Sequence, residues 1–326
     1  MPDIKKLRRI ALLTSGGDAP GMNAAIRSVV RTAIYNDVKV LGIRRGYAGL
    51  IKNDFEELDS RSVNRLSAKG GTCLYTARCS EMLTEDGVQR VADNCRYLGI
   101  DGLICIGGDG TFRGARALYE KGVPVIGIPA TIDNDIGCSH YTIGFDTAAN
   151  TAIECIDKLS DTMQSHERAS VVEVMGRHAG HLALYVGISC GAAVTLIPEE
   201  KFDIENDVAE VIRQGRINGR NHFIIIVAEG VGHTEQIARE IEQMTGVETR
   251  LTVIGHVQRG GSPTARDRVM ATRMGHYAVE CLLRGARDRV VVYRDSHICD
   301  LDISEALQMK KELDPYMYRV MREVSI

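Results

Sequence analysis

The 326-residue sequence has no long hydrophobic run, no excess of positive charge and no closely paired cysteines. No apolar stretch approaches the roughly 18 residues of a membrane span, and the one after the basic N-terminus stops at residues 14–17, too early for a signal peptide. With 40 Lys and Arg against 43 Asp and Glu, the net charge of −3 argues against a nucleic-acid-binding surface. The nine cysteines form no CxxC pair, which argues against a zinc site or disulfide framework and is typical of free thiols in a reducing compartment. We therefore expect a cytoplasmic protein with neither membrane nor nucleic-acid partners.

The composition is that of a globular protein, with 44% hydrophobic and 25% charged residues. At about 150 residues per domain, the length favours two domains, although no linker, repeat or low-complexity segment marks a boundary. Short apolar runs predict strands at residues 10–13, 38–43, 103–106, 125–128, 171–174, 223–228 and 252–254. Helical periodicity predicts helices at residues 22–34, 147–161, 181–189, 234–244 and 266–283. A further helix is expected to follow the glycine pair at residues 107–108 and to run through Leu118. Strands that are apolar throughout and alternate with helices predict parallel sheets covered on both faces.

In open parallel sheets, ligands bind beyond the carboxyl ends of the strands. The glycine-rich and polar segments of this chain follow the apolar runs, at residues 14–23, 107–111, 129–135, 174–177 and 255–261. We therefore expect the chemistry to be concentrated in these five segments.

Two glycine-rich turns, residues 16–17 and 107–110, are candidate phosphate cradles, because glycine lets backbone N–H groups approach an anion. A tight turn without any ligand is an equally good interpretation of either turn alone. Neither matches a P-loop, and Gly114 lies one residue too far along for GxGxxG. Asp109 would repel a phosphate unless a divalent cation such as Mg²⁺ lay between them, although it could instead cap the next helix.

Asp133 and Asp135 lie two residues apart in a turn, where one of them could accept a proton from an attacking hydroxyl. Considered alone, an Asx-turn cluster is the better explanation. Arginine binds phosphate through a planar fork of donors, although a single arginine is usually a solvated surface charge. Arg177 and Arg259 are the better candidates, because each follows an apolar strand in a glycine-containing turn.

Six segments occur here in one order: TSGGDAPGMNAAIR, GGDGT, TIDNDI, TIGFDTA, VVEVMGR and GHVQRGGSP. Together they resemble the bacterial ATP-dependent 6-phosphofructokinases over nearly the whole chain, from Ile10 to about Arg287. The resemblance implies two Rossmann-like three-layer α/β domains with mainly parallel sheets and an active site in the cleft between them. It implies an ATP- and Mg-binding domain of residues 1–143 plus about 257–308. The fructose 6-phosphate-binding domain would be residues 144–256 plus about 309–326.

The implied activity is a glycolytic kinase reaction, in which the γ-phosphoryl group of MgATP passes to the 1-hydroxyl of D-fructose 6-phosphate. The resemblance assigns ATP contacts to Gly17, Tyr47, Arg78, Cys79, Gly108, Asp109, Gly110 and Thr111, with Asp109 also holding Mg²⁺. It assigns sugar-phosphate contacts to Thr131, Ile132, Asp133, Arg168, Met175, Gly176, Arg177, Glu229, Arg250, His256, Val257, Gln258 and Arg259. The expected catalytic residues are Asp133 as general base, with Thr131, Arg177 and Gly17.

The resemblance also implies a homotetramer, in which Arg168 and Arg250 reach the 6-phosphate site of a neighbouring subunit. A second nucleotide site would take ADP or phosphoenolpyruvate, and Arg27, Arg31 and Arg220 match its basic residues. Other positions of that site depart from the family pattern, namely Ser60, Ser160, Ala193 and Asn218. We therefore expect weak regulation by these effectors, or a different ligand at this site.

Two other functions fit parts of the sequence. A diacylglycerol or NAD kinase would account for GGDGT, but not for residues 255–261 with their histidine and arginine. A catalytically silent nucleotide-binding subunit should have lost Asp109, Asp133 or Arg177, and all three are present.

Overall fold

The computed structural model describes residues 7–325, which form two compact units. The first unit contains the described residues up to Ile132, together with Ile136–Thr147 and Arg259–Lys311. The second contains Asp133–Asp135, Ala148–Gln258 and the described residues from Glu312 onward. Each unit is therefore built from separate stretches of the chain.

The first unit contains a seven-stranded sheet. Its spatial order is β11 (His297–Asp302), β10 (Arg289–Arg294), β5 (Val125–Pro129), β4 (Gly102–Gly107), β1 (Arg9–Thr14), β2 (Lys39–Ile43) and β3 (Phe55–Leu58). The five inner strands are parallel, and only the edge strands β3 and β11 run antiparallel to their neighbours. Every residue of β4 is buried, as expected for an inner strand with both faces covered.

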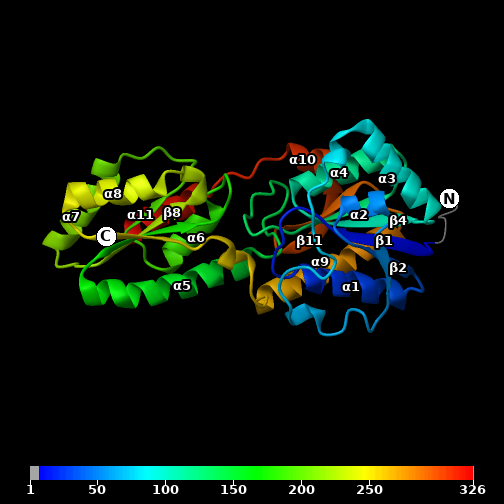
Figure 1. Cartoon of the computed structure of the whole chain (residues 1–326), viewed down its shortest axis with the longest axis horizontal. Coiled ribbons are helices and arrows are strands. Elements are labelled where there is room, and N and C mark those ends of the chain that lie inside the picture. Colours follow the sequence, from blue (N-terminus) through cyan, green and yellow to red (C-terminus); the bar gives the residue numbers. More distant parts are fainter. Residues whose placement is uncertain (1–6, 326) are drawn as a thin grey trace. The chain divides into compact units, whose positions relative to one another are not determined.

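Helices cover both faces of this sheet (Figure 1). One face carries α1 (Met22–Tyr35) and α9 (Ala265–Leu283), which pack together. The other carries α2 (Tyr47–Lys52), α3 (Glu85–Tyr97), α4 (Asp109–Glu120) and α10 (Ile303–Gln308). Short 3₁₀ helices lie at η1 (Leu66–Ala68) and η2 (Ser80–Leu83). Gly275 lets α9 approach α1 closely, because a Cβ there would lie 2.8 Å from the carbonyl oxygen of Ala25.

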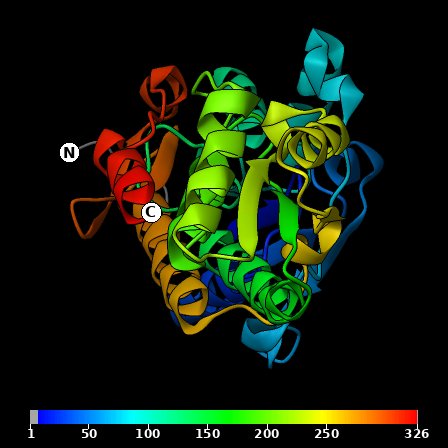
Figure 2. The same cartoon turned by 90° about the vertical axis from the view of Figure 1, so that its left-hand side faces the viewer.

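The second unit contains a parallel four-stranded sheet. Its order is β7 (Val194–Leu196), β8 (Phe223–Ala228), β6 (Ala169–Val174) and β9 (Thr249–Val253). Its helical elements are α5 (Phe145–His166), α6 (His181–Ser189), η3 (Ile204–Ala209), α7 (Glu210–Ile217), η4 (Glu229–Val231), α8 (Thr234–Thr245), η5 (Gly255–Arg259) and α11 (Pro315–Val324). Figure 1 shows α5 along one side of the sheet and α7 and α8 along the other. The C-terminal helix α11, red in Figure 2, packs against α6.

The strand expected at residues 252–254 is displaced, because β9 begins at Thr249 and ends at Val253. Its first two residues, Thr249 and Arg250, are polar, so a search for apolar runs does not find the beginning of this strand. The helix expected at residues 181–189 matches α6.

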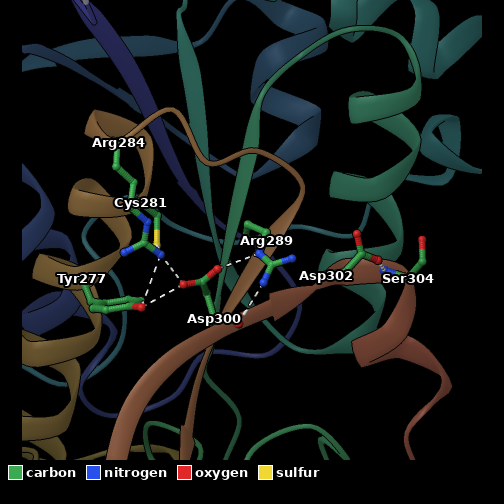
Figure 3. A network of polar contacts seen from close by, with 7 residues as sticks. All are labelled: Tyr277, Cys281, Arg284, Arg289, Asp300, Asp302 and Ser304. Carbon is green, nitrogen blue, oxygen red and sulfur yellow. Dashed lines mark hydrogen bonds and ion pairs between the residues drawn. The ribbon is translucent and has the colours of Figure 1, made fainter. Parts of the chain in front are cut away.

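A polar network fastens the edge hairpin β10–β11 to the end of α9 (Figure 3). Asp300 of β11 accepts hydrogen bonds from Tyr277 (2.8 Å) and Arg289 Nε (2.6 Å), and it pairs with Arg284. Burial would raise the pKa of Asp300, but the hydrogen bonds from Arg289 and Tyr277 and the two guanidinium charges lower it overall. The carboxylate is therefore ionised and stabilises the edge of the sheet.

The state of the cysteines and the character of the helices bear on two expectations from the sequence, free thiols and no membrane span. All nine cysteines are free thiols, four of them buried and five half-buried. Within residues 7–325, no helix is both long enough and apolar enough to cross a bilayer.

Candidate active site

The two expected phosphate turns lie side by side at the carboxyl ends of β1 and β4. The backbone N–H of Ser15 donates to Ile106 (3.0 Å), and the hydroxyl of Thr111 donates to the carbonyl of Ser15 (3.1 Å). Beyond this contact the cradle is open, because a Cβ on Gly108 or Gly110 would meet nothing within 4 Å. Gly108 directly precedes α4 and Gly110 is its second residue, so the cradle lies at the N-terminus of this helix. The geometry suits a phosphate group.

Asp109 is the first residue of α4 and is half-buried beside this open space. Among residues 7–325, no group of three or more His, Cys, Asp or Glu side chains could hold a metal ion. Mg²⁺ is usually held by one or two carboxylates together with phosphate oxygens and water. A single carboxylate at a phosphate cradle therefore fits Mg²⁺ carried by a nucleotide, and does not suit a metal held by protein ligands alone.

Tyr47 lies in the core beneath α4. Its side chain is 3% exposed, and its hydroxyl donates to the carbonyl of Thr111 (2.6 Å). Burial raises the pKa of Tyr47 well above its usual value. The resemblance places Tyr47 in contact with ATP, whereas this position lets it support the first turn of α4 from below.

Arg78 and Cys79 end an irregular segment, which contacts the first glycine turn through a hydrogen bond from Thr76 to Gly16. The side chain of Arg78 is exposed. The thiol of Cys79 is half-buried and lies 3.5 Å from the carboxylate of Glu81. Burial raises the pKa of Cys79, so this cysteine is a neutral thiol.

Arg259 lies over the first glycine turn. Its Nη1 donates to the carbonyl of Asp18 (3.2 Å), and a Cβ on Gly17 would lie 2.7 Å from the same nitrogen. The missing side chain of Gly17 therefore makes room for this guanidinium. The resemblance expects Arg259 at the sugar 6-phosphate, whereas its hydrogen bond is to the turn expected to bind the donor.

The turn after β6 presents Arg177, an exposed side chain whose backbone is left-handed (φ 59°). A non-glycine residue in this conformation is strained by about 1–2 kcal/mol, so its surroundings must hold it there. Glu229 does so, because its Oε1 accepts the N–H groups of Gly176 (3.2 Å) and Arg177 (2.5 Å). Gln258 holds Met175, two residues before Arg177, since its Oε1 accepts the N–H of Met175 (2.8 Å).

Gln258 is fully buried, whereas its neighbours His256 and Val257 are exposed. Its Nε2 is also buried and has no hydrogen-bond partner among the described residues. The resemblance places all three residues in a sugar-phosphate site. The burial of Gln258 makes it a support of the turn at residues 175–177, and leaves its neighbours accessible to a ligand.

Arg168 and Arg250 share one carboxylate in the second unit. Arg168 Nε lies 2.7 Å from Glu248 Oε2, and Arg250 pairs with the other oxygen. The hydrogen bond from Arg168, helped by both positive charges, lowers the pKa of Glu248. Glu248 is not among the residues expected from the sequence, where its signal is an acidic residue two positions before Arg250.

The segment at residues 131–133 is largely buried. Ile132 has no exposed surface and belongs to the core, while Asp133 is 6% exposed. The carbonyl of Thr131 accepts a hydrogen bond from the Thr142 hydroxyl (2.7 Å). Asn134 is left-handed (φ 51°), which an asparagine tolerates better than most residues do.

The expected effector residues are divided between the units. Arg27 and Arg31 lie on α1 in the first unit, half-buried and exposed respectively. Arg220 precedes β8, and its guanidinium donates to the carbonyls of His222 (3.2 Å) and Ser325 (3.3 Å). Burial lowers the pKa of Arg220. Backbone carbonyls thus already occupy donors that an effector phosphate would need.

A family model described as phosphofructokinase matches residues 9–282, which includes both glycine turns and every acceptor-side segment. The chain belongs to the phosphofructokinase family. Two curated relatives, from Bacillus velezensis and Clostridium tetani, are each named ATP-dependent 6-phosphofructokinase. They are 52% identical over 320 residues and 53% identical over 319 residues, and each match covers 98% of this chain and 100% of the relative.

Solved phosphofructokinase structures share the fold. The Saccharomyces cerevisiae enzyme has a TM-score of 0.86 at 33% identity; the match covers 98% of this chain but only 48% of the yeast chain. A pyrophosphate-dependent phosphofructokinase from Marinobacter aquaeolei has a TM-score of 0.85 at 23% identity, with 95% and 86% of the two chains covered. The second likeness shows the fold alone. This phosphofructokinase therefore has an α/β architecture with mainly parallel sheets in two units.

Proposed function

We propose that this chain is an ATP-dependent 6-phosphofructokinase that converts D-fructose 6-phosphate and MgATP into fructose 1,6-bisphosphate and ADP. The open cradle at Gly108–Gly110, with Asp109 at the N-terminus of α4, carries the proposal on the structural side. The names of the two relatives at 52% and 53% identity over their full lengths supply the donor and the substrate.

On the donor side, backbone N–H groups of the cradle bind the phosphates of ATP, and Arg78 adds a positive charge at the end of its segment. Asp109 would hold Mg²⁺. When bound, this ion neutralises charge on the donor phosphates. The protein's remaining task is to position the donor and to stabilise the developing charge, because phosphoryl transfer needs little covalent help.

On the acceptor side, Asp133 accepts the proton of the sugar 1-hydroxyl. The oxygen of that hydroxyl bonds to the γ-phosphorus as the bond from this phosphorus to the bridging oxygen of ADP breaks. Arg177 stabilises charge on the transferred group, and the strained turn held by Glu229 and Gln258 aims its guanidinium. Thr131 and Gly17 complete the proposed catalytic set.

His256 and Arg259 bind the 6-phosphate, while Arg168 and Arg250 reach the corresponding site of a neighbouring subunit in a homotetramer. In the single chain both of these arginines pair with Glu248, so a phosphate must compete with this carboxylate for their donors.

ATP rather than pyrophosphate is the proposed donor. A Cβ on Gly110 would project into open space, so an aspartate at this position would put a carboxylate into the cradle. Such a charge would repel the α-phosphate of ATP, which pyrophosphate lacks. Ala130 is buried and uncharged, and offers no positive charge to a short donor.

The test is a coupled assay of ADP release with MgATP and fructose 6-phosphate, with the sugar omitted as a blank and pyrophosphate as an alternative donor. Gly110→Asp should abolish ATP use, whereas the matched variant Gly110→Ala adds volume without charge and should retain part of it. Absence of sugar-dependent ADP release, or turnover with pyrophosphate alone, would refute the proposal. ATP binding without turnover would instead support a silent nucleotide-binding subunit.

A further inference from the structure

The irregular segment at residues 69–79, here called the donor arm, ends at Arg78 and Cys79 and contains no helix or strand. The arm residues before Arg78 have no role in the mechanism above, and neither do Thr14 and Asn23 at the two ends of the first glycine-rich segment. We propose that Thr14, Asn23, Thr72 and Thr76 are positioning residues that fix the donor arm and thereby set the affinity for ATP. This inference rests on the proposed function, because it takes Arg78 and Cys79 to be nucleotide contacts.

Asn23 anchors the beginning of the arm. It lies in the first turn of α1, and its side chain is 2% exposed. Its Nδ2 donates to the carbonyls of Lys69 (3.1 Å) and Gly70 (3.0 Å), and its Oδ1 accepts the N–H of Cys73 (2.8 Å). Among residues 7–325, the three hydrogen bonds of this buried amide all go to the arm.

Thr14 and Thr72 fasten the middle of the arm to the end of β1. The Thr14 hydroxyl donates to the carbonyl of Tyr75 (2.9 Å), which can only accept. The contact between the two hydroxyls (2.8 Å) must therefore use the proton of Thr72. The Thr72 oxygen in turn accepts the N–H of Leu74 (3.3 Å). Each donor in this chain is therefore fixed: Leu74 donates to Thr72, Thr72 to Thr14, and Thr14 to Tyr75.

Thr76 links the arm to the glycine turn itself. Its hydroxyl donates to the carbonyl of Gly16 (2.6 Å), two residues before Arg78 in the arm. On the other side, the N–H of Arg45 donates to Leu74 (2.8 Å), and its guanidinium lies 5.3 Å from the centre of the Tyr75 ring. The arm is thus held from β1, α1 and the turn after β2.

An irregular segment has no ladder of backbone hydrogen bonds to keep it ordered, so these side-chain hydrogen bonds add to the order that the buried Leu74 and its bond from Arg45 provide. If they are removed, the arm must be ordered when the nucleotide binds, and the entropy of ordering weakens binding. None of the residues assigned to the sugar phosphate lies in the arm. A positioning role therefore predicts a loss of affinity for ATP alone, whereas a purely structural role predicts losses for both substrates.

The decisive variant is Thr76→Val, which keeps the shape but removes the hydroxyl, and its matched partner is Thr76→Ser, which keeps the hydroxyl. Equilibrium dialysis with MgATP measures affinity without turnover, and steady-state assays give KM for each substrate. One hydrogen bond corresponds to a change of about two- to tenfold, so ATP affinity should fall by this factor in Thr76→Val. KM for fructose 6-phosphate should stay within about twofold, and Thr76→Ser should behave as wild type.

Thr245→Val is the control for loss of a hydroxyl, because Thr245 in α8 donates to the carbonyl of Ile241 at a comparable 2.7 Å. Its ATP affinity should be unchanged. Asn23→Asp removes both donors to the arm and should weaken ATP binding more than Thr76→Val does. If Asn23→Asp fails to fold, Thr76→Val still decides the question, because Thr76 is only half-buried and its substitution perturbs the fold less.

Unchanged ATP affinity in Thr76→Val would overturn the inference. So would equal increases in both KM values, because these would show a general loss of structure. A wild-type protein that binds MgATP but releases no ADP would refute the proposed function. The role of the arm would then be decided by comparing the MgATP affinities of wild type and Thr76→Val, measured by dialysis. A wild-type protein that binds no ATP would overturn both.

Discussion

Replacing Asp267 by asparagine should lower the free energy of unfolding of the first unit by about 1–3 kcal/mol. Asp267 lies on α9 with no exposed surface, and its carboxylate accepts four hydrogen bonds. Oδ1 accepts from the Tyr141 hydroxyl (2.5 Å) and the Gly144 N–H (2.7 Å). Oδ2 accepts from the N–H (2.8 Å) and the hydroxyl (2.5 Å) of Thr147.

The magnitude follows from which donors asparagine leaves unpaired. Burial raises the pKa of Asp267 despite these four donors, so removal of its charge is not itself destabilising. The new amide can donate to the hydroxyl of Tyr141 or Thr147, each of which can also accept. One backbone N–H, of Gly144 or of Thr147, then lies buried without an acceptor, which costs about 1–3 kcal/mol. Alanine leaves both N–H groups without an acceptor, so Asp267→Ala should cost about 2–6 kcal/mol plus a cavity term.

Urea unfolding followed by far-ultraviolet circular dichroism is the appropriate assay, because the chain contains no tryptophan. Asp267 and its partners all belong to the first unit, so the transition of that unit should shift. Asp93→Asn is a matched control, since that side chain is 58% exposed. An Asp267→Asn variant as stable as wild type, or an alanine variant no less stable than the asparagine one, would refute the reasoning.

Four further predictions concern other sites. Asp133→Asn should fold and bind fructose 6-phosphate but lose about 10²–10⁴-fold in kcat, the usual contribution of a general base; near-normal turnover would remove it from the mechanism. Gln258→Leu leaves the N–H of Met175 without its acceptor and should lower kcat/KM for the sugar about five- to hundredfold at constant ATP affinity, a split that parallel KM measurements would reveal. The pKa of Asp300 is lowered in the folded state, so its ionised carboxylate stabilises the fold above about pH 4, and this contribution is lost as the pH falls below that value. The difference in urea midpoint between wild type and Asp300→Asn should therefore disappear in acid. A difference that stays constant with pH would argue against the ion pairs. Millimolar ADP or phosphoenolpyruvate should shift half-saturation by fructose 6-phosphate only weakly, whereas a strong shift abolished by Arg27→Ala would show a working effector site.

The strands that could be predicted from the sequence are those buried on both faces. The runs at residues 10–13, 103–106 and 223–228 lie in β1, β4 and β8, whose inner positions leave no room for polar residues. The edge strands β3 and β11 carry half-exposed acidic residues and lack this pattern. Their pairing depends on tertiary partners, which local periodicity cannot show.

For the candidate site, motif spacing identified the segments but not the orientation of each side chain. Tyr47 and Gln258 have polar groups that could bind a ligand, and only packing shows that both are buried. Glu248 meets Arg168 because β6 and β9 are paired in register, with Ala169 opposite Thr249. A register between distant strands is not visible in the sequence, so this ion pair could not be predicted.

The strand order of the first unit also affects how the chain is made. β10 pairs with β5, with Arg289 opposite Ile126. One edge of the inner strand β5 therefore has no partner until the ribosome has synthesised about 160 further residues. At about 5–20 residues per second, translation leaves that edge of β5 unpaired for roughly 10–30 s. An open edge of an apolar strand is a template for pairing with another chain. A ribosome that stalls between residues 130 and 288 therefore carries a nascent chain prone to associate with its neighbours on the same messenger RNA.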